Sequence, residues 1–552
     1  MQKLKKRWKI KNNMPELSSS TKELVNKYQL WKISLKPKEG VATIHVDEVA
    51  SRVAVFYEQI RTIIDWKEEH LMRRAAIIRK LKRRFLDLEI SDFSAQSISE
   101  PLVLELIRGG YFSNDKIAES KISDISKIIN KYVFILRNNP EYKKGKTGVQ
   151  FYAKILEIAA CEIEETLSPS IKEMALIDFM FSQMQKKIRV NENIYSRGLL
   201  KREDTDVQIY IAVQRSLFKL DEPIISYNIL RYKYSYWDNP SEDDLLKISQ
   251  GIKKILKSID SALLHPMQKR FYKICERFDT PYLLLSDVLS AELSENIAEE
   301  IENPVALENN IRNAYFVRLR DLGLKIKRAA IYSITSIFIT KIISLVILEI
   351  ILAKIFNEAF NFIVLAADVL IPTLLMTFLV MTVKMPSKNN VGLAVMETMK
   401  IVYDNEKKDF YDVSPSKKRS LLMRLILSLI YLAGATISFG LLVWIFVYFH
   451  FPITSIAINI MFIALILFAG KAIQRKAKEL TIEETREGFI EFISDILILP
   501  ITELGKLLSN TWKQYNAIAA FFSALIDMPF SSFVEFLERW RYFLRERKDD
   551  IQ

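Results

Sequence analysis

AAIYSITSIFITKIISLVILEIILAKI, residues 329–355, is the first of four long apolar segments that decide the fold. The other three are residues 359–383, 421–448 and 452–472. Each has about the ~20 residues that a helix needs to cross the ~30 Å hydrocarbon core of a bilayer. Very few residues join the first segment to the second, or the third to the fourth. The sequence therefore predicts two transmembrane helical hairpins.

Lysine and arginine flank these segments on one side only. They gather before the first segment, between the second and the third, and after the fourth, whereas the hairpin tips carry almost none, Lys354 being the exception. Because cytoplasmic flanks retain positive charge, both termini and the loop between the hairpins are predicted to be cytoplasmic. The basic stretch Met1–Asn13 leads into polar residues, which argues against a cleaved signal peptide. The Ile- and Lys-rich composition favours a prokaryotic plasma (inner) membrane.

The composition favours an all-α fold. The chain of 552 residues contains only 14 glycines and 16 prolines, which disfavours turn-rich β folds and glycine-looped nucleotide sites. Its net charge of +13 is best explained by attraction to anionic lipid head groups, with nucleic acid a less favoured partner. Cys161 and Cys275 lie far apart and suggest buried thiols rather than a disulfide or metal framework.

The predicted domain order follows from the apolar segments. Residues 1–28 are expected to form a basic flexible tail, and residues 29–322 a large cytoplasmic helical domain. Within that domain, alternating apolar residues around Pro37–Gly40 predict a small β-hairpin at residues 30–46. Residues 323–383 are expected to form the first hairpin, residues 384–420 a cytoplasmic loop, and residues 421–472 the second hairpin. Residues 473–552 are expected to form cytoplasmic amphipathic or interfacial helices, with an apolar run that Pro500 interrupts.

Apolar residues at spacings of three and four predict several helices in the cytoplasmic domain. The longest is expected from Asp47 to about Leu88, and the others are residues 117–136, 151–167, 171–188, 206–220 and 243–264. The polar stretch Pro140–Gly148 is a candidate boundary between two lobes, and a helical solenoid is the alternative arrangement. Only Gly323 interrupts the approach to the first apolar segment. One glycine weakens a helix by ~1 kcal/mol without necessarily ending it, so a continuous helix is expected there.

The far end of the helix predicted at residues 47–88 is densely basic. Such a run is either the solvated face of a bundle helix or a patch that binds anionic lipid or a partner protein. The residues of this candidate patch are Arg73, Arg74, Arg79, Lys80, Lys82, Arg83 and Arg84.

The last predicted helix has an aromatic face opposite a mixed charged face. A helix of this kind suits the membrane interface, although docking on the soluble domain or on another subunit would produce the same pattern. The residues of the candidate interfacial face are Phe533, Phe536, Leu537, Trp540, Phe543 and Leu544.

No catalytic, cofactor or metal site is predicted, so the chain is not expected to be an enzyme. Gly145, Lys146 and Thr147 look like the end of a phosphate-binding loop, but Pro140 stands where that loop needs its first glycine. Zinc needs three or four converging ligands, and the histidines are scattered. They are His45, His70, His265 and His450.

Three charges and a proline inside the first hairpin form a candidate intramembrane polar site: Lys341, Glu349, Asp368 and Pro372. A charge at the centre of a membrane helix costs about 2.5–3.5 kcal/mol on insertion scales, so these groups should face protein or water. Counting residues back from the hairpin tip places Lys341 within reach of Asp368. Pro372 cannot donate to the carbonyl of Asp368, four residues earlier. The site is therefore either a buried ion pair that fixes the hairpin, which is preferred, or part of an ion or proton path.

Three functions remain open at this point. The leading one is a non-enzymatic membrane scaffold or adaptor, whose helical cytoplasmic domain binds protein partners. The first alternative is an oligomeric channel or transporter that uses the charges of the first hairpin. The second is membrane remodelling by the amphipathic tail. A homo-oligomer is compatible with all three.

Overall fold

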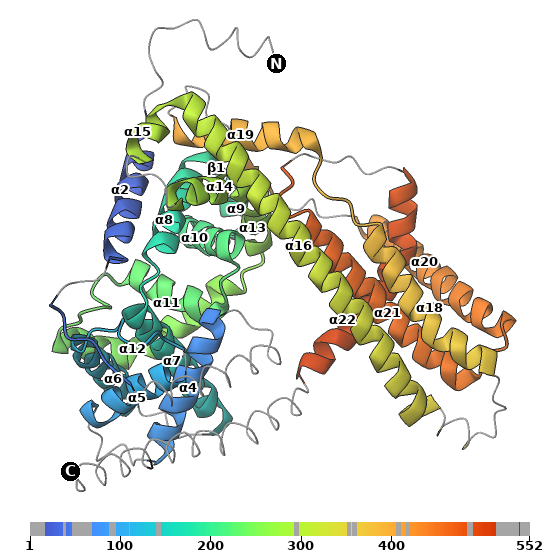
Figure 1. The fold of residues 1–552 in the computed structure, drawn as a ribbon, viewed down its shortest axis with the longest axis horizontal. Coiled ribbons are helices and arrows are strands. Elements are labelled where there is room, and N and C mark those ends of the chain that lie inside the picture. Colours follow the sequence, from blue (N-terminus) through green and yellow to red (C-terminus); the bar gives the residue numbers. More distant parts are fainter. Residues whose placement is uncertain are drawn as a thin grey trace, which may run out of the picture. The chain divides into compact units, whose positions relative to one another are not determined.

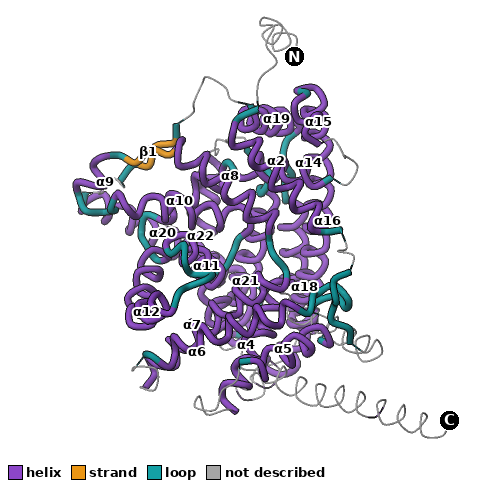
Figure 2. The backbone as a smooth tube through the Cα atoms, turned by 90° about the vertical axis from the view of Figure 1, so that its left-hand side faces the viewer, coloured by secondary structure: helices purple, strands orange, loops and turns teal. Residues whose placement is uncertain are grey.

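The computed structural model describes residues 17–36, 40–46, 69–87, 95–109, 111–139, 145–291, 297–349, 351, 355, 362–403, 410–415, 420–482, 489–514 and 540. Across these residues the chain is almost entirely helical, which confirms the all-α fold (Figure 2). The chain divides into two compact units. We call the described parts of residues 18–279 and 410–414 the helical unit, and those of residues 280–403 and 415–514 the hairpin unit.

The helical unit is an assembly of helices with one short sheet (Figure 1). Its helices are α2 Ser19–Ser34, α4 Glu69–Asp87, α5 Gln96–Arg108, α6 Ser120–Arg137, α7 Gly145–Leu167, α8 Ile171–Lys187, α9 Glu192–Ser196, α10 Arg202–Phe218, α11 Glu222–Lys233, α12 Glu242–Leu263 and α13 Gln268–Arg277. Strands β1 Ile188–Val190 and β2 Tyr411–Val413 pair in parallel, with Ile188 opposite Tyr411. The ring of Phe278 stacks on Tyr411 at 4.2 Å between centroids, so this short sheet is fixed on α13.

Helix α10 lies at the centre of the helical unit. Every residue from Val207 to Gln214 is buried, and the helix contacts α8, α11, α12 and α13. Two of the buried residues are polar and are hydrogen-bonded. The side-chain amide of Gln208 donates to the carbonyl of Ala262 at 2.9 Å, and Asn228 Nδ2 donates to Gln214 Oε1 at 2.7 Å. Buried amides are stable only when paired in this way, so these bonds also fix the register of α10 against its neighbours.

A buried charged network joins α6, α7 and the turn after α11. Lys131 Nζ lies 2.5 Å from Glu162 Oε1 and donates to the carbonyl of Trp237 at 2.9 Å. The hydroxyl of Tyr132 donates to Glu162 Oε2 at 2.7 Å. The carboxylate is therefore satisfied at both oxygens although it is withdrawn from water.

The hairpin unit contains four helices that are long and apolar enough to cross a membrane, as predicted. These are the helical spans Pro304–Ile347, Ile363–Met381, Leu421–Tyr448 and Ile453–Ala477. The helices of this unit are α14 Asp279–Ser290, which begins one residue before the unit, α15 Ile297–Glu302, α16 Pro304–Ser344, the π-helix η2 Leu345–Glu349, α18 Phe362–Met381, α19 Lys388–Val402, α20 Leu421–Tyr448, α21 Ile453–Ala477 and α22 Phe489–Gln514.

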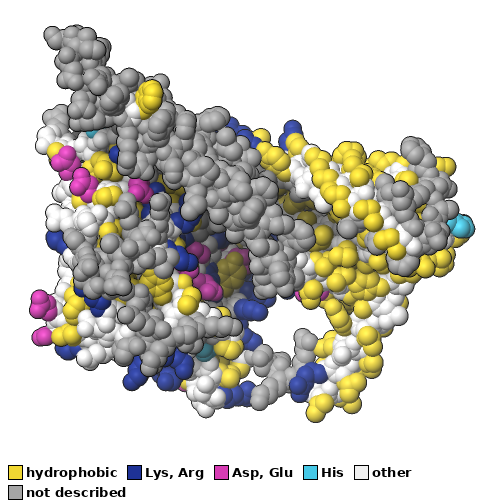
Figure 3. Space-filling model, turned by 90° about the horizontal axis from the view of Figure 1, so that it is seen from below, with side chains coloured by type: hydrophobic (Ala, Val, Ile, Leu, Met, Phe, Trp, Pro, Cys, Tyr) yellow, Lys and Arg dark blue, Asp and Glu magenta, His cyan; other side chains and the backbone are white. Residues whose placement is uncertain are grey.

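Large apolar side chains cover the outside of the hairpin unit. Leu421 is 75% exposed, Trp444 64% and Phe378 63%. In Figure 3 hydrophobic side chains dominate the part of the surface that these helices form. A contiguous apolar surface of this kind is not stable in water, so the four helices indicate association with a membrane.

Helix α16 runs unbroken from Pro304 to Ser344 and passes through Gly323 without interruption, as expected. Asn303 caps its start, since its side chain accepts from the backbone N–H of Val305 and of Ala306. Its first half is tied to α19 by the fully buried Asn390. The Asn390 Nδ2 donates to the hydroxyl of Tyr315 at 2.8 Å and to the carbonyl of Leu480 at 2.6 Å.

Two predictions for the N-terminal region are wrong. Residues 19–28 form the first part of α2 rather than a flexible tail, and Leu30–Ser34 continue this helix instead of forming a β-hairpin. The side chain of Ser18 caps the helix, and Thr21, Leu24, Val25 and Tyr28 are buried at helical spacing. Thr43 forms an isolated bridge with Ala118, which is remote in sequence. The turn residues Pro37–Glu39 lie outside the described residues.

The other helical predictions differ less. Helices α6, α7, α8, α10 and α12 confirm the predicted helices, with shifts at their ends. The described part of the helix predicted at residues 47–88 is α4, and residues 47–68 lie outside the described part of the chain. The predicted break at Pro500 is wrong, because α22 continues through this proline.

Candidate functional site

Two of the three charges predicted inside the first hairpin meet in the structure. Lys341 on α16 and Asp368 on α18 form an ion pair with 2.7 Å between Nζ and Oδ2. Their side chains are 0% and 1% exposed, respectively. Breaking such a pair leaves a bare charge in an apolar surrounding, so the pair fixes α16 against α18.

A third helix completes this site. Asn459, 1% exposed, lies in the first third of α21, and its Nδ2 donates to Asp368 Oδ1. The ring of Phe462, one turn further along, lies 5.1 Å from Lys341 Nζ. The aspartate is thus held by one cation and one amide, and the ammonium by a carboxylate and a ring face. We call Lys341, Asp368 and Asn459 the buried triad.

Two oxygen atoms at the buried triad have neither a hydrogen bond nor an ion pair within the described residues. These are Asn459 Oδ1 and Ser344 Oγ, which lies one turn after Lys341 on α16. A third, Asp368 Oδ2, accepts no hydrogen bond and is held only by its ion pair with Lys341. A buried acceptor without a partner is costly, so each is a place where a water molecule or an ion can be held.

The other two predicted residues of the first hairpin lie elsewhere. Pro372 is inside α18, which continues to Met381, and the next residue, Thr373, donates through its hydroxyl to the carbonyl of Val369 at 3.0 Å. Glu349 is the last residue of the π-helix, and its side chain is not among those described.

Helix α22 packs along α20 and α21 through small residues. Gly434 on α20 faces Ile496, and a Cβ at Gly434 would lie 3.2 Å from the carbonyl oxygen of Ile496. The Ser438 hydroxyl donates to the carbonyl of Leu497 at 2.7 Å. Small residues permit this close approach of helix backbones in lipid.

The candidate basic patch is mostly engaged inside the helical unit. Arg74 is buried and forms a two-pronged ion pair with Asp221, at 2.8 and 2.6 Å. Arg73 donates to the carbonyl of Tyr111 at 3.0 Å, and Lys80 Nζ lies 2.7 Å from Glu105 Oε2. The other described members are Arg79, which donates to the Tyr111 hydroxyl at 3.1 Å, and the exposed Lys82. The side chains of Arg83 and Arg84 are outside the described residues.

A buried carboxyl beside Arg74 makes the stability of the helical unit depend on pH. Burial raises the pKa of Glu164 to about 7, although Arg74 opposes the rise. The unfolded chain binds this proton only near the ordinary value of 4.5. The free energy of unfolding of the helical unit should therefore rise as pH falls from 7 to 4.5, because the folded state binds the proton and the unfolded chain does not. Above pH 7 this contribution is absent, because the buried carboxylate is charged.

Replacing Glu164 with glutamine should stabilise the helical unit at pH 8 by about 1–2 kcal/mol, because the buried charge is removed. At pH 5 the effect should be small, since Glu164 already holds its proton in the folded state. Thermal unfolding of the purified protein across this pH range measures the difference. The partly exposed Glu173 on α8, replaced in the same way, is the control; an equal gain from both variants would contradict the assignment.

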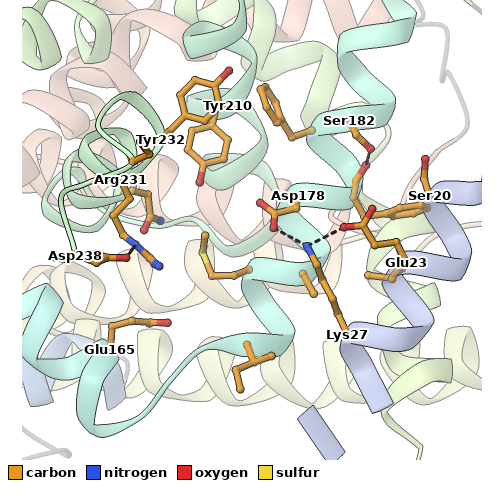
Figure 4. A pocket seen from close by; sticks show the side chains of 18 of the residues that line it. Ser20, Glu23, Lys27, Glu165, Asp178, Ser182, Tyr210, Arg231, Tyr232 and Asp238 are labelled. Atoms are coloured by element: carbon orange, nitrogen blue, oxygen red, sulfur yellow. Dashed lines mark hydrogen bonds and ion pairs between the residues drawn. The ribbon is translucent and has the colours of Figure 1, made fainter. Parts of the chain in front are cut away.

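The helical unit also contains an open cleft of about 770 Å³ between α2, α8 and α11 (Figure 4). Its walls carry six charged side chains and three tyrosines: Glu23, Lys27, Glu165, Asp178, Arg231, Asp238, Tyr210, Tyr232 and Tyr234. Its volume lies in the range of ligand-binding clefts. None of these residues was predicted as a site, because they come from separate helices and follow no local motif.

Of the candidate interfacial face, the structure describes only Trp540, which is 54% exposed. Phe533, Phe536, Leu537, Phe543 and Leu544 lie outside the described residues.

Compared with known proteins, the chain matches no protein family, no curated protein and no solved structure.

Proposed function

We propose that this chain is a non-enzymatic, membrane-anchored scaffold or adaptor. The observation that carries the proposal is the contrast between its two units. In the hairpin unit the charges of the buried triad are neutralised inside the bundle, and the exposed surface of the membrane-length helices is apolar. In the helical unit, charged and aromatic side chains line an open cleft. One unit thus suits lipid and the other suits a soluble partner.

We place the helical unit in the cytoplasm and the hairpin unit in the plasma membrane. The basic residues before α16 and after α21 support this orientation, because cytoplasmic flanks retain positive charge. Anionic lipid head groups are then the natural partners of these flanks. The uncharged turn between α20 and α21 would face the opposite side.

Helix α22 adds a fifth membrane-embedded helix to this proposal. It runs antiparallel to α21, since Asp495 pairs with Lys471 at 3.0 Å and Gly505 faces Ala464. Ala464 lies eleven residues, or ~17 Å, from the start of α21, which is the end at the hairpin tip. Helix α22 extends nine residues, or ~14 Å, beyond Gly505 to Gln514, which is nearly the same distance. The C-terminal end of α22 therefore reaches about the level of the hairpin tip, which replaces the expectation that residues 473–552 are all cytoplasmic.

A deletion tests the adaptor proposal. Removing residues 18–279 should abolish recruitment of a soluble partner, because the cleft lies within this segment, whereas the remaining chain should still be extracted from membranes only by detergent. Recruitment and extraction are measured on the same preparations. Unchanged recruitment would contradict the proposal, provided that the shortened chain is still membrane-bound.

A second function, proton or ion transport, is favoured by the two unpartnered oxygens beside the buried triad. Acceptors of this kind next to a carboxylate occur along ion pathways. Replacing Asp368 with asparagine should then change proton or cation flux into reconstituted vesicles at constant protein level. If only the protein level falls, the triad is structural and the transport hypothesis is wrong.

A further inference from the structure

The cleft of the helical unit has a surplus of negative charge, although the whole chain carries a net charge of +13. Four carboxylates and two cations line it. Lys27 is neutralised by Asp178 at 3.1 Å and by Glu23 at 3.3 Å, and Arg231 by Asp238 at 3.0 Å. Both cations are therefore already paired, and the cleft keeps an excess of two carboxylate charges.

Glu165 is a carboxylate of the cleft that has no ion pair within the described residues. Its two oxygens accept hydrogen bonds from the backbone N–H of Ser170 at 3.2 Å and from the Ser170 hydroxyl at 2.6 Å. These bonds fix the carboxylate but do not neutralise its charge. Figure 4 shows Glu165 below Arg231 and Asp238, on the opposite side of the view from Lys27.

The surrounding charge acts on the other titratable groups of the cleft. Burial on its own lowers the pKa of Lys27, but Asp178 and Glu23 outweigh it and raise the pKa above its ordinary value. The pKa of Arg231 is raised in the same way, because Tyr227 and Asp238 outweigh its burial. Positive charge is thus stabilised on both sides of the cleft.

Aromatic rings form the end of the cleft. Tyr210 and Tyr232 are stacked with 5.2 Å between centroids, and Phe181 contacts Tyr210 at 5.1 Å and Tyr232 at 5.7 Å. Tyr232 remains 44% exposed. Ring faces of this kind attract guanidinium and ammonium groups. The cleft therefore joins two features that favour the same ligand chemistry, excess carboxylate and exposed tyrosine.

We propose that this cleft binds an arginine- or lysine-bearing segment of a partner protein, whose cationic side chains are attracted by the excess carboxylates, Glu165 among them, and by the exposed ring of Tyr232. The inference rests on the adaptor function and names the class of its partner. The cleft is open and spans several helices, so it fits a segment of chain better than an enclosed small molecule. Complementary charge would also steer the segment toward the cleft.

The test uses the full chain in mild detergent and two fluorescein-labelled peptides of equal length, one of arginine and glycine and one of glutamate and glycine. The arginine peptide should bind, with an affinity that falls as salt is added, and the glutamate peptide should not. Tyr232→Leu and Glu165→Gln should each weaken binding of the arginine peptide by about three- to tenfold. Fluorescence anisotropy gives the dissociation constants.

Two variants outside the cleft are matched controls. Tyr236→Leu removes a ring of similar exposure, 39%, and Glu173→Gln removes a nearby carboxylate. Neither residue lines the cleft, so both variants should bind the arginine peptide as the unaltered chain does. Equal losses from cleft and control variants would overturn the proposal, as would equal binding of the two peptides.

Residues 1–13 contain five lysines, one arginine and no acidic residue, and they are a competing occupant. If their removal raises the affinity for the arginine peptide, the cleft binds this segment of its own chain and the assignment to a partner is wrong. Unchanged affinity supports the partner. Peptide binding can fail while a soluble partner is still recruited; that result would overturn the cleft assignment and leave the adaptor function standing.

Discussion

Replacing Lys341 with methionine is expected to destabilise the hairpin unit by about 3–5 kcal/mol, because the buried Asp368 would lose its counter-charge. The pair is fully withdrawn from solvent, with 0% and 1% exposure, so water cannot take over the role of the lysine. Thermal unfolding of the detergent-solubilised protein, together with its level in membranes, measures the loss.

The double variant Lys341→Met with Asp368→Leu is the control for this prediction. It removes both charges, and replacing a whole buried pair with apolar residues is often neutral or stabilising. Most of the lost stability should return, less the cost of leaving Asn459 Nδ2 without its acceptor. A double variant as unstable as the single one would mean that the methionine acts through its shape and not through charge.

Replacing Gly505 with alanine should destabilise the contact between α22 and α21 by about 3 kcal/mol, the upper part of the range for overpacking. A Cβ at this position would overlap the carbonyl oxygen of Ala464 and lie 3.0 Å from Phe468 Cβ. A backbone carbonyl cannot rotate out of the way as a flexible side chain can, so the two helices must move apart.

Gly440 on α20 is the matched control for Gly505. A Cβ there would meet no atom within 4 Å, so Gly440→Ala should be neutral or slightly stabilising through the helix propensity of alanine. Thermal unfolding of the two variants in the same detergent separates contact from propensity. Equal stability of the two variants would contradict the close approach of α22 to α21.

The apolar segments could be predicted because each carries its signal in consecutive residues. A membrane-length helix needs a long run of apolar side chains, and four such runs stand in the sequence. The pair of Lys341 and Asp368 was also accessible, since depth in a hairpin follows from counting residues back from the tip. The periodic helices of the helical unit, such as α12, followed from spacing alone.

Contacts between remote segments could not be predicted in this way. The sequence shows that Asn459 is a polar residue between apolar neighbours in a membrane-length helix. It does not show that its partner is Asp368 on α18. Pro500 interrupts the apolar run in the sequence, and an interior proline usually ends a helix, yet α22 continues through it in contact with α20 and α21. Trp31, Ile33 and Leu35 alternate with polar residues as in a strand, but the cap at Ser18 and the buried Tyr28 belong to a helix that continues to Ser34.

The cleft illustrates the same limit for function. Glu165, Asp178 and Arg231 belong to α7, α8 and α11, and only the fold brings them together with Tyr232. No sequence motif marks them. The basic run on α4, by contrast, is conspicuous in the sequence as a candidate surface patch, but most of its described side chains make contacts inside the helical unit, such as the ion pair of Arg74 with Asp221.

The most direct test of the adaptor proposal is purification of the intact chain in mild detergent, with the mass of the particle and its co-purifying proteins determined together. The proposal predicts a soluble partner in a fixed ratio that is lost from the variant carrying both Tyr232→Leu and Glu165→Gln, and that is kept by the variant carrying Tyr236→Leu and Glu173→Gln. A closed oligomer of this chain alone, with the same mass in all variants, would contradict the adaptor function and favour transport through the hairpin unit.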